Sequence, residues 1–341
     1  MQTDMHFNMI YFIARVIGFL PKAAKKIAYA SQHVDFAECN NLIHTVKFHV
    51  DMVGTSHRPL DFKKLRKTKN RFRPWLPFHF LPSGKNLRCE MNGTLIQPML
   101  EYVLLHKDDP YFLHLVGIVL HVLCDSYSHW GFVGQNDESN KINNRSLKIL
   151  ETPKSITKFF WKELSIFKEK IKGSIAERVP VGHCAIGSMA DIPYLHFKYT
   201  TEDGREVSRD NPKNFIEAAR KVYEFLIRVL AEKSTCGEIK KNQTWADIMP
   251  TVGDLIRQKG SLEKRVNRWQ ETIKSGKYFV VKNTDRRLRY IPQSWRHEEL
   301  VQQINNGKPP DACHPLLFNQ AAHFYERFIL KQLREEGLIL S

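Results

Sequence analysis

The stretch that decides the fold is residues 113–130, which read LHLVGIVLHVLCDSYSHW. His121, Asp125 and His129 occur in it at every fourth position. In an α-helix, each step of four residues drifts only about 40° around the axis, so the three side chains share one stripe. Apolar residues fill almost all the other positions, which predicts a buried helix. Two imidazoles and a carboxylate in such a helix need partners, because burying them unpaired is costly.

A metal ion would satisfy all three of these side chains, since it binds neutral imidazole and ionised carboxylate. A carboxylate between two histidines could also bridge two ions. The structural alternative is a buried hydrogen-bonded network without metal. We favour metal binding, because the three residues repeat on one face of a segment that is otherwise apolar.

The helical period dominates the rest of the chain and predicts an all-α protein with minor β-hairpins. The expected helices are residues 8–19, 21–50, 94–107, 110–131, 154–173, 212–233, 244–259, 261–275, 295–306 and 315–336. One hairpin is expected to pair Tyr278–Lys282 with Arg287–Ile291 across a turn at 283–286. A second is expected within residues 195–206, with its turn at Asp203–Gly204.

The domain organisation expected from the sequence is a single compact unit of 341 residues, because no Gly/Ser linker or internal repeat divides the chain. Residues 1–240 would form the metal-binding helical domain. Residues 241–341 would form a C-terminal helical subdomain packed on it.

The charge balance is strongly basic, with 52 Lys+Arg against 36 Asp+Glu and a formal net charge of +16. Such a surface attracts anions, whether phosphate esters, nucleic acid or an anionic membrane, although it could also serve solubility alone. A basic loop at residues 58–73 precedes His79. It could attract a phosphate-containing substrate or contact a membrane or nucleic acid, and the alternative is a solvated charge run. No stable protein partner is inferred.

The compartment expected from the sequence is the cytoplasm. The six cysteines include no CxxC pair, which favours a reducing environment. No apolar segment is long enough to span a bilayer. The apolar stretch Met9–Leu20 carries Arg15 and lacks the features of a signal peptide. Export by a signal-independent route stays open.

Other positions supply side chains of the same kind as the central stripe. These candidate metal ligands are Asp4, His6, Asp35, His79, His183 and Asp191. Each has an ordinary alternative, such as a solvated carboxylate for Asp35 or a core histidine for His79. Small residues around His183, in GHCAIG at 182–187, would allow close approach of another element or a ligand.

In this order the candidate ligands resemble those of the zinc-dependent phospholipase C and S1/P1 nuclease fold. That fold is an all-helical bundle that uses three zinc ions. Its signature is an Asp at the end of an early helix, a loop His, an HxxxD helix followed by another His, and a later His with a carboxylate. More narrowly, QTDMHF at 2–7, ASQHVD at 30–35, FHFLP at 78–82 and HWGF at 129–132 are similar to an uncharacterised bacterial family, DUF6765. That similarity covers most of the chain.

The resemblance implies two or three divalent ions, with zinc expected and iron or manganese as alternatives. One ion would be held by Asp35, His79, His121 and Asp125, and a second by His129, His183 and Asp191. Asp125 would bridge to a third ion, held by Asp4 and His6 at the chain's start.

Two features depart from the phospholipase and nuclease pattern. Those families use the amine of an N-terminal tryptophan as a metal ligand, whereas this chain begins Met1–Gln2, so Asp4 and His6 would have to substitute. Their late histidine and carboxylate are about one helical turn apart, whereas His183 and Asp191 are separated by eight positions.

The function expected is metal-dependent hydrolysis of phosphoesters, similar to that of phospholipase C. Clustered ions lower the pKa of a bound water and stabilise the leaving oxygen. The resemblance suggests Asp35 as the residue that orients or deprotonates the attacking water. One alternative is a nuclease or phosphodiesterase acting on nucleic acid or nucleotides, which a flat aromatic stacking pocket would favour. The other is a non-catalytic, metal-stabilised binding protein. The sequence has no HD doublet, HExxH, GxSxG or Walker A motif.

Overall fold

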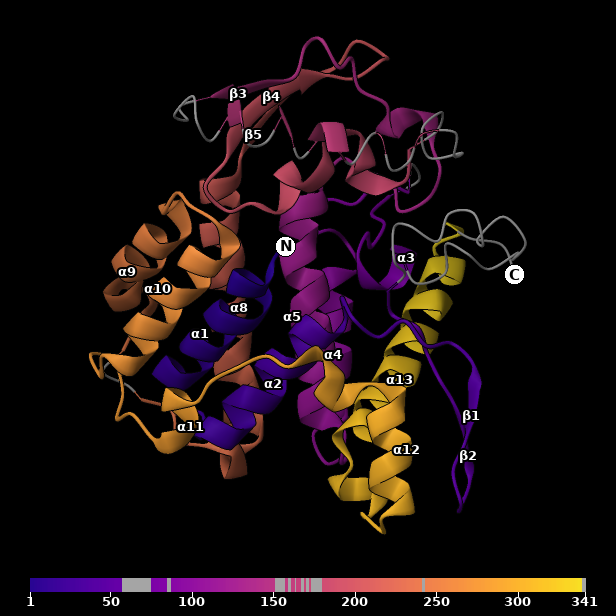
Figure 1. Cartoon of the computed structure of the whole chain (residues 1–341), viewed down its shortest axis with the longest axis vertical. Coiled ribbons are helices and arrows are strands. Elements are labelled where there is room, and N and C mark those ends of the chain that lie inside the picture. The colour runs from indigo at the N-terminus through magenta and orange to yellow at the C-terminus, as the bar shows by residue number, and fades with distance from the viewer. Residues whose placement is uncertain are drawn as a thin grey trace.

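A computed structural model of the chain describes residues 1–56, 75–84, 87–150, 180–240 and 243–338, with a few residues between 157 and 172. Within these ranges the protein is mainly helical and has two small antiparallel sheets. The helices form the body of the molecule, and the three-stranded sheet lies over one end of it (Figure 1). The prediction of a helical protein with minor hairpins is confirmed at this level.

The predicted buried helix at 110–131 is α5 (Phe112–His129), which lies in the centre of the bundle (Figure 1). All of its residues except Leu113 are buried. It contacts α2 (Pro21–His33), α4 (Ile96–Leu105), α8 (Asn211–Glu232) and α13 (His314–Glu335). The central stripe is therefore enclosed by helices from both ends of the chain.

The N-terminal segment begins with a π-helical turn, η1 (Asp4–Met9), that continues into α1 (Ile10–Ile17). The predicted helix at 21–50 is wrong beyond His33. Residues Leu42–His44 (β1) and His49–Asp51 (β2) instead pair as an antiparallel hairpin. The consecutive asparagines at 40–41 are poor helix formers, and the β-branched residues that follow suit a strand.

The region after residue 240 supplies four further helices among its described residues. They are α9 (Trp245–Arg257), α10 (Leu262–Lys274), α11 (Asn283–Arg286) and α12 (His297–Asn305), with 3₁₀ turns η7 (Pro292–Trp295) and η8 (Pro310–Ala312). The hairpin predicted at 278–291 is wrong. Its expected turn is the short helix α11, in which the Asp285 carboxylate accepts from the backbone nitrogen of Lys282 at 2.6 Å.

The second predicted hairpin is present with its turn at the expected place, but its second strand lies beyond the predicted segment except at Glu206. Strands β4 (His196–Thr200) and β5 (Glu206–Asp210) pair antiparallel, with Thr200 opposite Glu206. Strand β3 (Lys148–Leu150) adds to the other edge of β4. The remaining elements are α3 (Trp75–Phe78) and the 3₁₀ segments η4 (Glu138–Asn140), η5 (Gly182–Asp191) and η6 (Ser234–Cys236).

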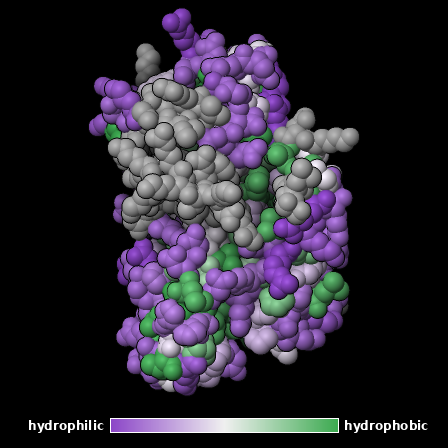
Figure 2. All heavy atoms as spheres, turned by 90° about the vertical axis from the view of Figure 1, so that its right-hand side faces the viewer, coloured by the Kyte–Doolittle hydropathy of each residue, from purple (hydrophilic) through white to green (hydrophobic). Residues whose placement is uncertain are grey.

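One apolar core runs through the helices and includes residues from both ends of the chain. Phe12, for example, packs against Trp269 and Tyr278. A second cluster lies beneath the three-stranded sheet. The surface coloured in Figure 2 is mostly hydrophilic, with apolar residues in small groups. None of the described helices combines the length and apolarity needed to cross a membrane.

Two predicted segments lie wholly or largely outside the described residues. They are the basic loop at 58–73 and the helix at 154–173, of which only a few residues are described.

Gly117 allows α2 and α5 to pack closely. A Cβ at this position would lie 2.4 Å from the carbonyl oxygen of Ile27 and 2.5 Å from the Cβ of Ala30. Alanine favours a helix by about 1 kcal/mol over glycine. We nevertheless expect Gly117→Ala to lower the free energy of unfolding by about 1–3 kcal/mol, because the two helices must separate.

Chemical denaturation measures this effect, and Gly253→Ala in α9 is the matched control. A Cβ at Gly253 meets mainly the flexible end of Arg257, so that variant should be neutral or slightly stabilised. A Gly117→Ala protein at least as stable as the wild type would show that the helices do not depend on this close approach.

Candidate metal centre

Eight of the nine predicted ligands converge at one end of α5. Among the described residues, three groups each bring their donor atoms within 4.8 Å of one another: His6, His121 and Asp125; Asp35, His79 and His121; and His129, His183 and Asp191. The residues come from η1, from the segments that follow α2 and α3, from α5 and from η5. The chain start lies beside the same end of α5 in Figure 1.

Asp125 connects the first two groups through its two carboxylate oxygens. Its Oδ1 lies 3.0 Å from His6 Nε2. Its Oδ2 lies 3.0 Å from His121 Nε2 and 3.1 Å from His79 Nδ1. The carboxylate is 1% exposed. This arrangement suits a residue that bridges two ions.

Four of the histidines have their outer ring nitrogen bonded to a backbone carbonyl. The distances are 2.9 Å for His121 Nδ1 to Ser31 O, 2.9 Å for His79 Nε2 to Thr55 O, 2.8 Å for His129 Nδ1 to His79 O, and 2.7 Å for His183 Nδ1 to Gly187 O. A carbonyl only accepts, so each of these nitrogens carries the proton. The opposite nitrogen, which faces the centre, therefore presents a lone pair, as a metal-ligating histidine does.

The inner nitrogens His79 Nδ1 and His121 Nε2 lie only 3.2 Å apart. With the tautomers set by the carbonyls, two lone pairs face each other, and a cation or an added proton must lie near them. Burial opposes that proton, but the hydrogen bond and charge of Asp125, together with the charge of Asp35, outweigh burial and raise the pKa of His79. A divalent ion fits this donor set and would displace the proton.

His6 belongs to the first group, but no backbone carbonyl among the described residues accepts from its outer ring nitrogen. Its ring stacks on His121 with centroids 3.9 Å apart. Burial and the nearby His121 hold the pKa of His6 well below its usual range, so the ring is neutral. Its Nδ1 has no hydrogen-bond partner among the described residues.

Asp35 is the most accessible acid of the centre, since its side chain is 29% exposed. Its Oδ1 lies 3.9 Å from both His79 Nδ1 and His121 Nε2. Gln32 donates to its other oxygen at 2.9 Å. Partial burial raises the pKa of this carboxyl. Asp35 can therefore face both an ion and an incoming molecule.

The third group shows how residues separated by eight positions converge. The η5 segment is kinked at His183 and at Gly187, whose φ is 56°. Asp191 consequently lies with Oδ1 3.0 Å from His129 Nε2 and Oδ2 3.4 Å from His183 Nε2. A Cβ on Gly182 would lie 2.2 Å from the Phe80 ring, which itself stacks on His129. The small residue beside His183 thus permits a close approach, and the approaching group is Phe80.

The carboxyl groups of Asp125 and Asp191 are ionised in this setting. Burial alone would favour their neutral forms. The neighbouring imidazoles and the amino group of Met1 outweigh it and hold both pKa values well below the usual range. The centre therefore combines imidazoles with ionised carboxylates, which is the donor set that divalent transition metals bind.

The amino group of Met1 lies between two of the groups. It donates to Asp125 Oδ1 at 2.6 Å and lies 3.2 Å from Asp191 Oδ1. Burial lowers the pKa of this amino group. The charges of Asp125, Asp191 and Asp35 outweigh burial and raise the pKa to about 11. The resemblance led us to expect Asp4 and His6 in place of the amine ligand of those families, whereas the structure places the amino group of Met1 itself at the centre.

Asp4 belongs to none of the three groups. Its Oδ2 accepts from Arg265 Nε at 2.6 Å in a buried ion pair. Its role as a metal ligand thus stays a prediction, and the structure gives it a different partner.

Arg209 is a residue that the sequence analysis overlooked. It donates to the backbone oxygens of Ser128, at 2.8 Å, and of Trp130. Its guanidinium lies over the rings of Trp130 and Phe132. It therefore caps the end of α5 that carries His129. Nothing in the sequence distinguishes it from other basic residues in strands.

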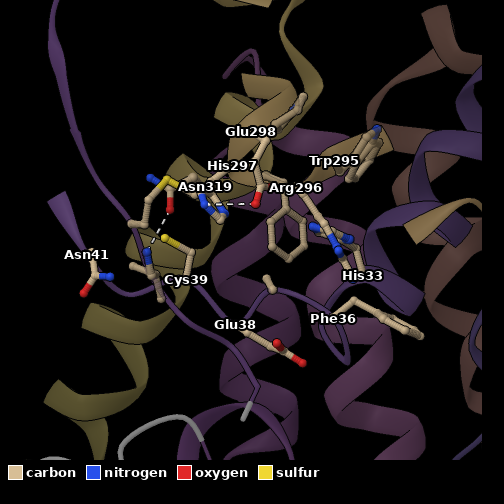
Figure 3. A pocket seen from close by; sticks show the side chains of 15 residues that line it. His33, Phe36, Glu38, Cys39, Asn41, Trp295, Arg296, His297, Glu298 and Asn319 are labelled. Atoms are coloured by element: carbon tan, nitrogen blue, oxygen red, sulfur yellow. Dashed lines mark hydrogen bonds and ion pairs between the residues drawn. The ribbon is translucent and has the colours of Figure 1, made fainter. Parts of the chain in front are cut away.

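A pocket of about 290 Å³ lies beside the segment that carries Asp35 (Figure 3). Its walls include the rings of His33, Phe36, Trp295 and Phe318. Arg296, Glu298 and Asn319 add polar groups. These rings are steeply inclined to one another, by 73° between His33 and Trp295 and by 79° between His33 and Phe318, so a planar ligand could stack on one ring at a time.

The geometry defines a mainly helical protein whose buried histidines and aspartates could hold several metal ions. The chain belongs to DUF6765, described as a family of unknown function, whose profile matches residues 1–333. The resemblance to that family is therefore confirmed. No curated protein and no solved structure matches the chain. The likeness to phospholipase C and S1/P1 nuclease rests on the ligand pattern.

Proposed function

We propose that this protein is a metal-dependent hydrolase of phosphoesters with a di- or trinuclear centre. The observation that carries the proposal is the pair His79 Nδ1 and His121 Nε2, which lie 3.2 Å apart. Backbone carbonyls fix both rings so that lone pairs face each other, and Asp125 lies against both. Without a cation or an added proton, a hydrogen-bonded network would place a donor opposite an acceptor here.

The three groups suggest which residues would hold each ion. Asp35, His79, His121 and Asp125 would hold one ion, His129, His183 and Asp191 a second, and His6 with Asp125 a third. When bound, such ions lower the pKa of water and polarise phosphoryl oxygens. Zinc suits imidazole and carboxylate donors, and iron and manganese share part of that preference.

Asp35 is the residue we assign to the attacking water. Its carboxylate is partly exposed, so it can accept a hydrogen bond from a water molecule at the edge of the centre. The more deeply buried Asp125 has no comparable access.

A phospholipase C-like activity is the first candidate among phosphoester hydrolases. The pocket lined by His33 and Phe36 favours a second, a phosphodiesterase acting on nucleotides or nucleic acid, because a base could stack on one of its rings. The basic composition suits either anionic substrate. A non-catalytic protein that uses the metals for stability is the remaining alternative.

Metal analysis and hydrolysis assays test the proposal together. Protein purified without chelator should contain at least two equivalents of zinc, iron or manganese. It should hydrolyse bis-p-nitrophenyl phosphate, with phosphatidylcholine vesicles and a short oligonucleotide distinguishing the substrate classes. His121→Ala should lower the rate by about 10²-fold, since metal stabilisation of a transition state is worth several kcal/mol.

His44→Ala, in the exposed strand β1, is the matched control and should retain the wild-type rate. Fewer than two equivalents of metal would reject the multinuclear centre. Equal rates in the wild type and His121→Ala would reject the assigned site. Full metal content without hydrolysis of any of the three substrates would favour the non-catalytic alternative.

A further inference from the structure

Arg265 connects the C-terminal region to the chain's start, behind the candidate metal centre. It lies on α10 and is 3% exposed. Its Nε donates to Asp4 Oδ2 at 2.6 Å, and its Nη2 donates to the side-chain oxygen of Gln2. Its Nη1 donates to the carbonyl oxygen of Gly260 at 2.8 Å. Each of the three guanidinium nitrogens therefore donates a hydrogen bond.

These contacts fix the turn that presents His6. The backbone nitrogens of Met5 and His6 both donate to the carbonyl oxygen of Gln2, at 2.9 and 3.0 Å. Arg265 thus holds Gln2 and Asp4, which precede His6 in the same turn. The His6 ring in turn lies between His121 and the Asp125 carboxylate. A shift of this turn would move His6 Nε2 away from Asp125.

The same guanidinium contacts a second ligand-bearing segment. It lies 5.5 Å from the ring centroid of Tyr194, three positions after Asp191. The Tyr194 hydroxyl donates to Gly260, the residue whose carbonyl also accepts from Arg265. Arg265 therefore contacts both the segment that carries His6 and the segment that carries Asp191.

The Asp4 carboxylate depends on this contact. The carboxylate is 1% exposed, and Arg265 is its charged partner. Its other oxygen, Oδ1, has no hydrogen-bond partner among the described residues. Removing the guanidinium would leave the turn with an unpaired buried carboxylate, and the turn would rearrange to solvate or protonate it.

We propose that Arg265 is a positioning residue that holds His6 in place to bind a metal ion. The inference rests on the metal centre of the proposed function and adds a role for the C-terminal region. It also gives Asp4 a part in the centre as the anchor of the turn. Residues that orient a metal ligand typically change metal affinity by about 10–100-fold when replaced.

Metal titration of four variants tests this role. Zinc or cobalt content and affinity are measured for Arg265→Met, His6→Ala, the double variant, and Arg268→Met as the control. Arg268 is exposed on the same helix. Arg265→Met should bind one ion about 10–100-fold more weakly and keep the others. The double variant should match His6→Ala, because both changes act on one ligand. The cobalt absorption spectrum reports directly on the altered ligand.

Wild-type affinity for every ion in folded Arg265→Met would overturn the proposal, as would additive effects in the double variant. A purely structural salt bridge would lower the melting temperature and leave the metal affinities of the folded protein unchanged. If Arg265→Met does not fold, Arg265→Lys replaces it, since it keeps the charge beside Asp4 and loses the second contact to Gln2. A wild type without metal would reject both proposals, whereas metal binding without hydrolysis would reject only the proposed function.

Discussion

Asp125→Asn is expected to remove at least one metal ion from the protein and to lower phosphoester hydrolysis by about 10³-fold, or about 4 kcal/mol of transition-state stabilisation. The reason is that Asp125 faces two ligand groups at once. One oxygen lies 3.0 Å from His6 Nε2, and the other lies within 3.1 Å of His121 and His79. An asparagine keeps one oxygen and turns an NH₂ group toward the other group, where it cannot bind a metal.

Thermal unfolding with and without metal measures this loss independently of catalysis. An ion that binds only the folded protein stabilises it by about 4 kcal/mol at a concentration 1,000 times its dissociation constant. Most of the metal-induced rise in melting temperature should therefore disappear in Asp125→Asn. Because each protein is compared with its own metal-free form, any direct effect of the substitution on folding cancels.

Asp51→Asn is the control, since the Asp51 side chain is 73% exposed and lies on the hairpin of β1 and β2. It should retain metal content, rate and metal-dependent stabilisation. An Asp125→Asn protein with the full complement of metal would contradict the bridging role of Asp125. Removing the metal from the wild type with a chelator should abolish its metal-dependent stabilisation and lower its rate of hydrolysis, as in the variant.

The second large effect is expected from Asp285→Asn, far from the metal centre in sequence. Asp285 is fully buried, and its Oδ1 accepts from the Tyr11 hydroxyl at 2.6 Å and from Arg15 Nε at 2.7 Å. Asparagine would leave the Arg15 guanidinium without a charged partner. Breaking a buried pair in this way typically costs about 3–5 kcal/mol of unfolding free energy.

The pH dependence of stability gives a second readout for the same pair. Burial disfavours the charged Asp285, but Arg15 and Tyr11 outweigh burial and lower its pKa. A lowered pKa contributes stability above the unfolded value of about 4, and this contribution is lost as the pH falls through the folded value. The stability gap between wild type and Asp285→Asn should therefore narrow below about pH 4.

Denaturant unfolding at neutral and acidic pH measures both effects. Asp254→Asn, at an exposed position of α9, is the control and should change stability by less than about 0.5 kcal/mol. A loss of under about 1 kcal/mol at neutral pH would show that the Arg15–Asp285 pair contributes little beyond its desolvation.

The sequence contained enough information to predict the central helix, because its apolar pattern is long and its polar exceptions keep the helical period. It also allowed the hairpin at β4 and β5 to be predicted from Asp203–Gly204. The hairpin at 278–291 failed because Asp285 forms contacts with Arg15 and Tyr11, which lie about 270 positions away in the chain. Periodicity within a window carries no information on such a partner.

In the candidate centre, too, the local pattern was predictable and the long-range contacts were not. The stripe of α5 predicted three of the candidate ligands, and the resemblance supported the others that converge on it. The partner of Asp4 could not be predicted, because Arg265 looks like any basic residue of a surface helix until the fold buries it. The bend that brings His183 to Asp191 depends on the conformation of Gly187, which spacing alone does not reveal.

The carbonyl contacts of the four histidines have a consequence for how this family can vary. The acceptors belong to the main chain of Ser31, Thr55, His79 and Gly187. Every amino acid carries the same carbonyl, so the side chains at Ser31 and Thr55 can drift without changing which nitrogen faces the centre. The path of the backbone therefore sets the orientation of these candidate ligands, whichever side chains occupy positions 31 and 55.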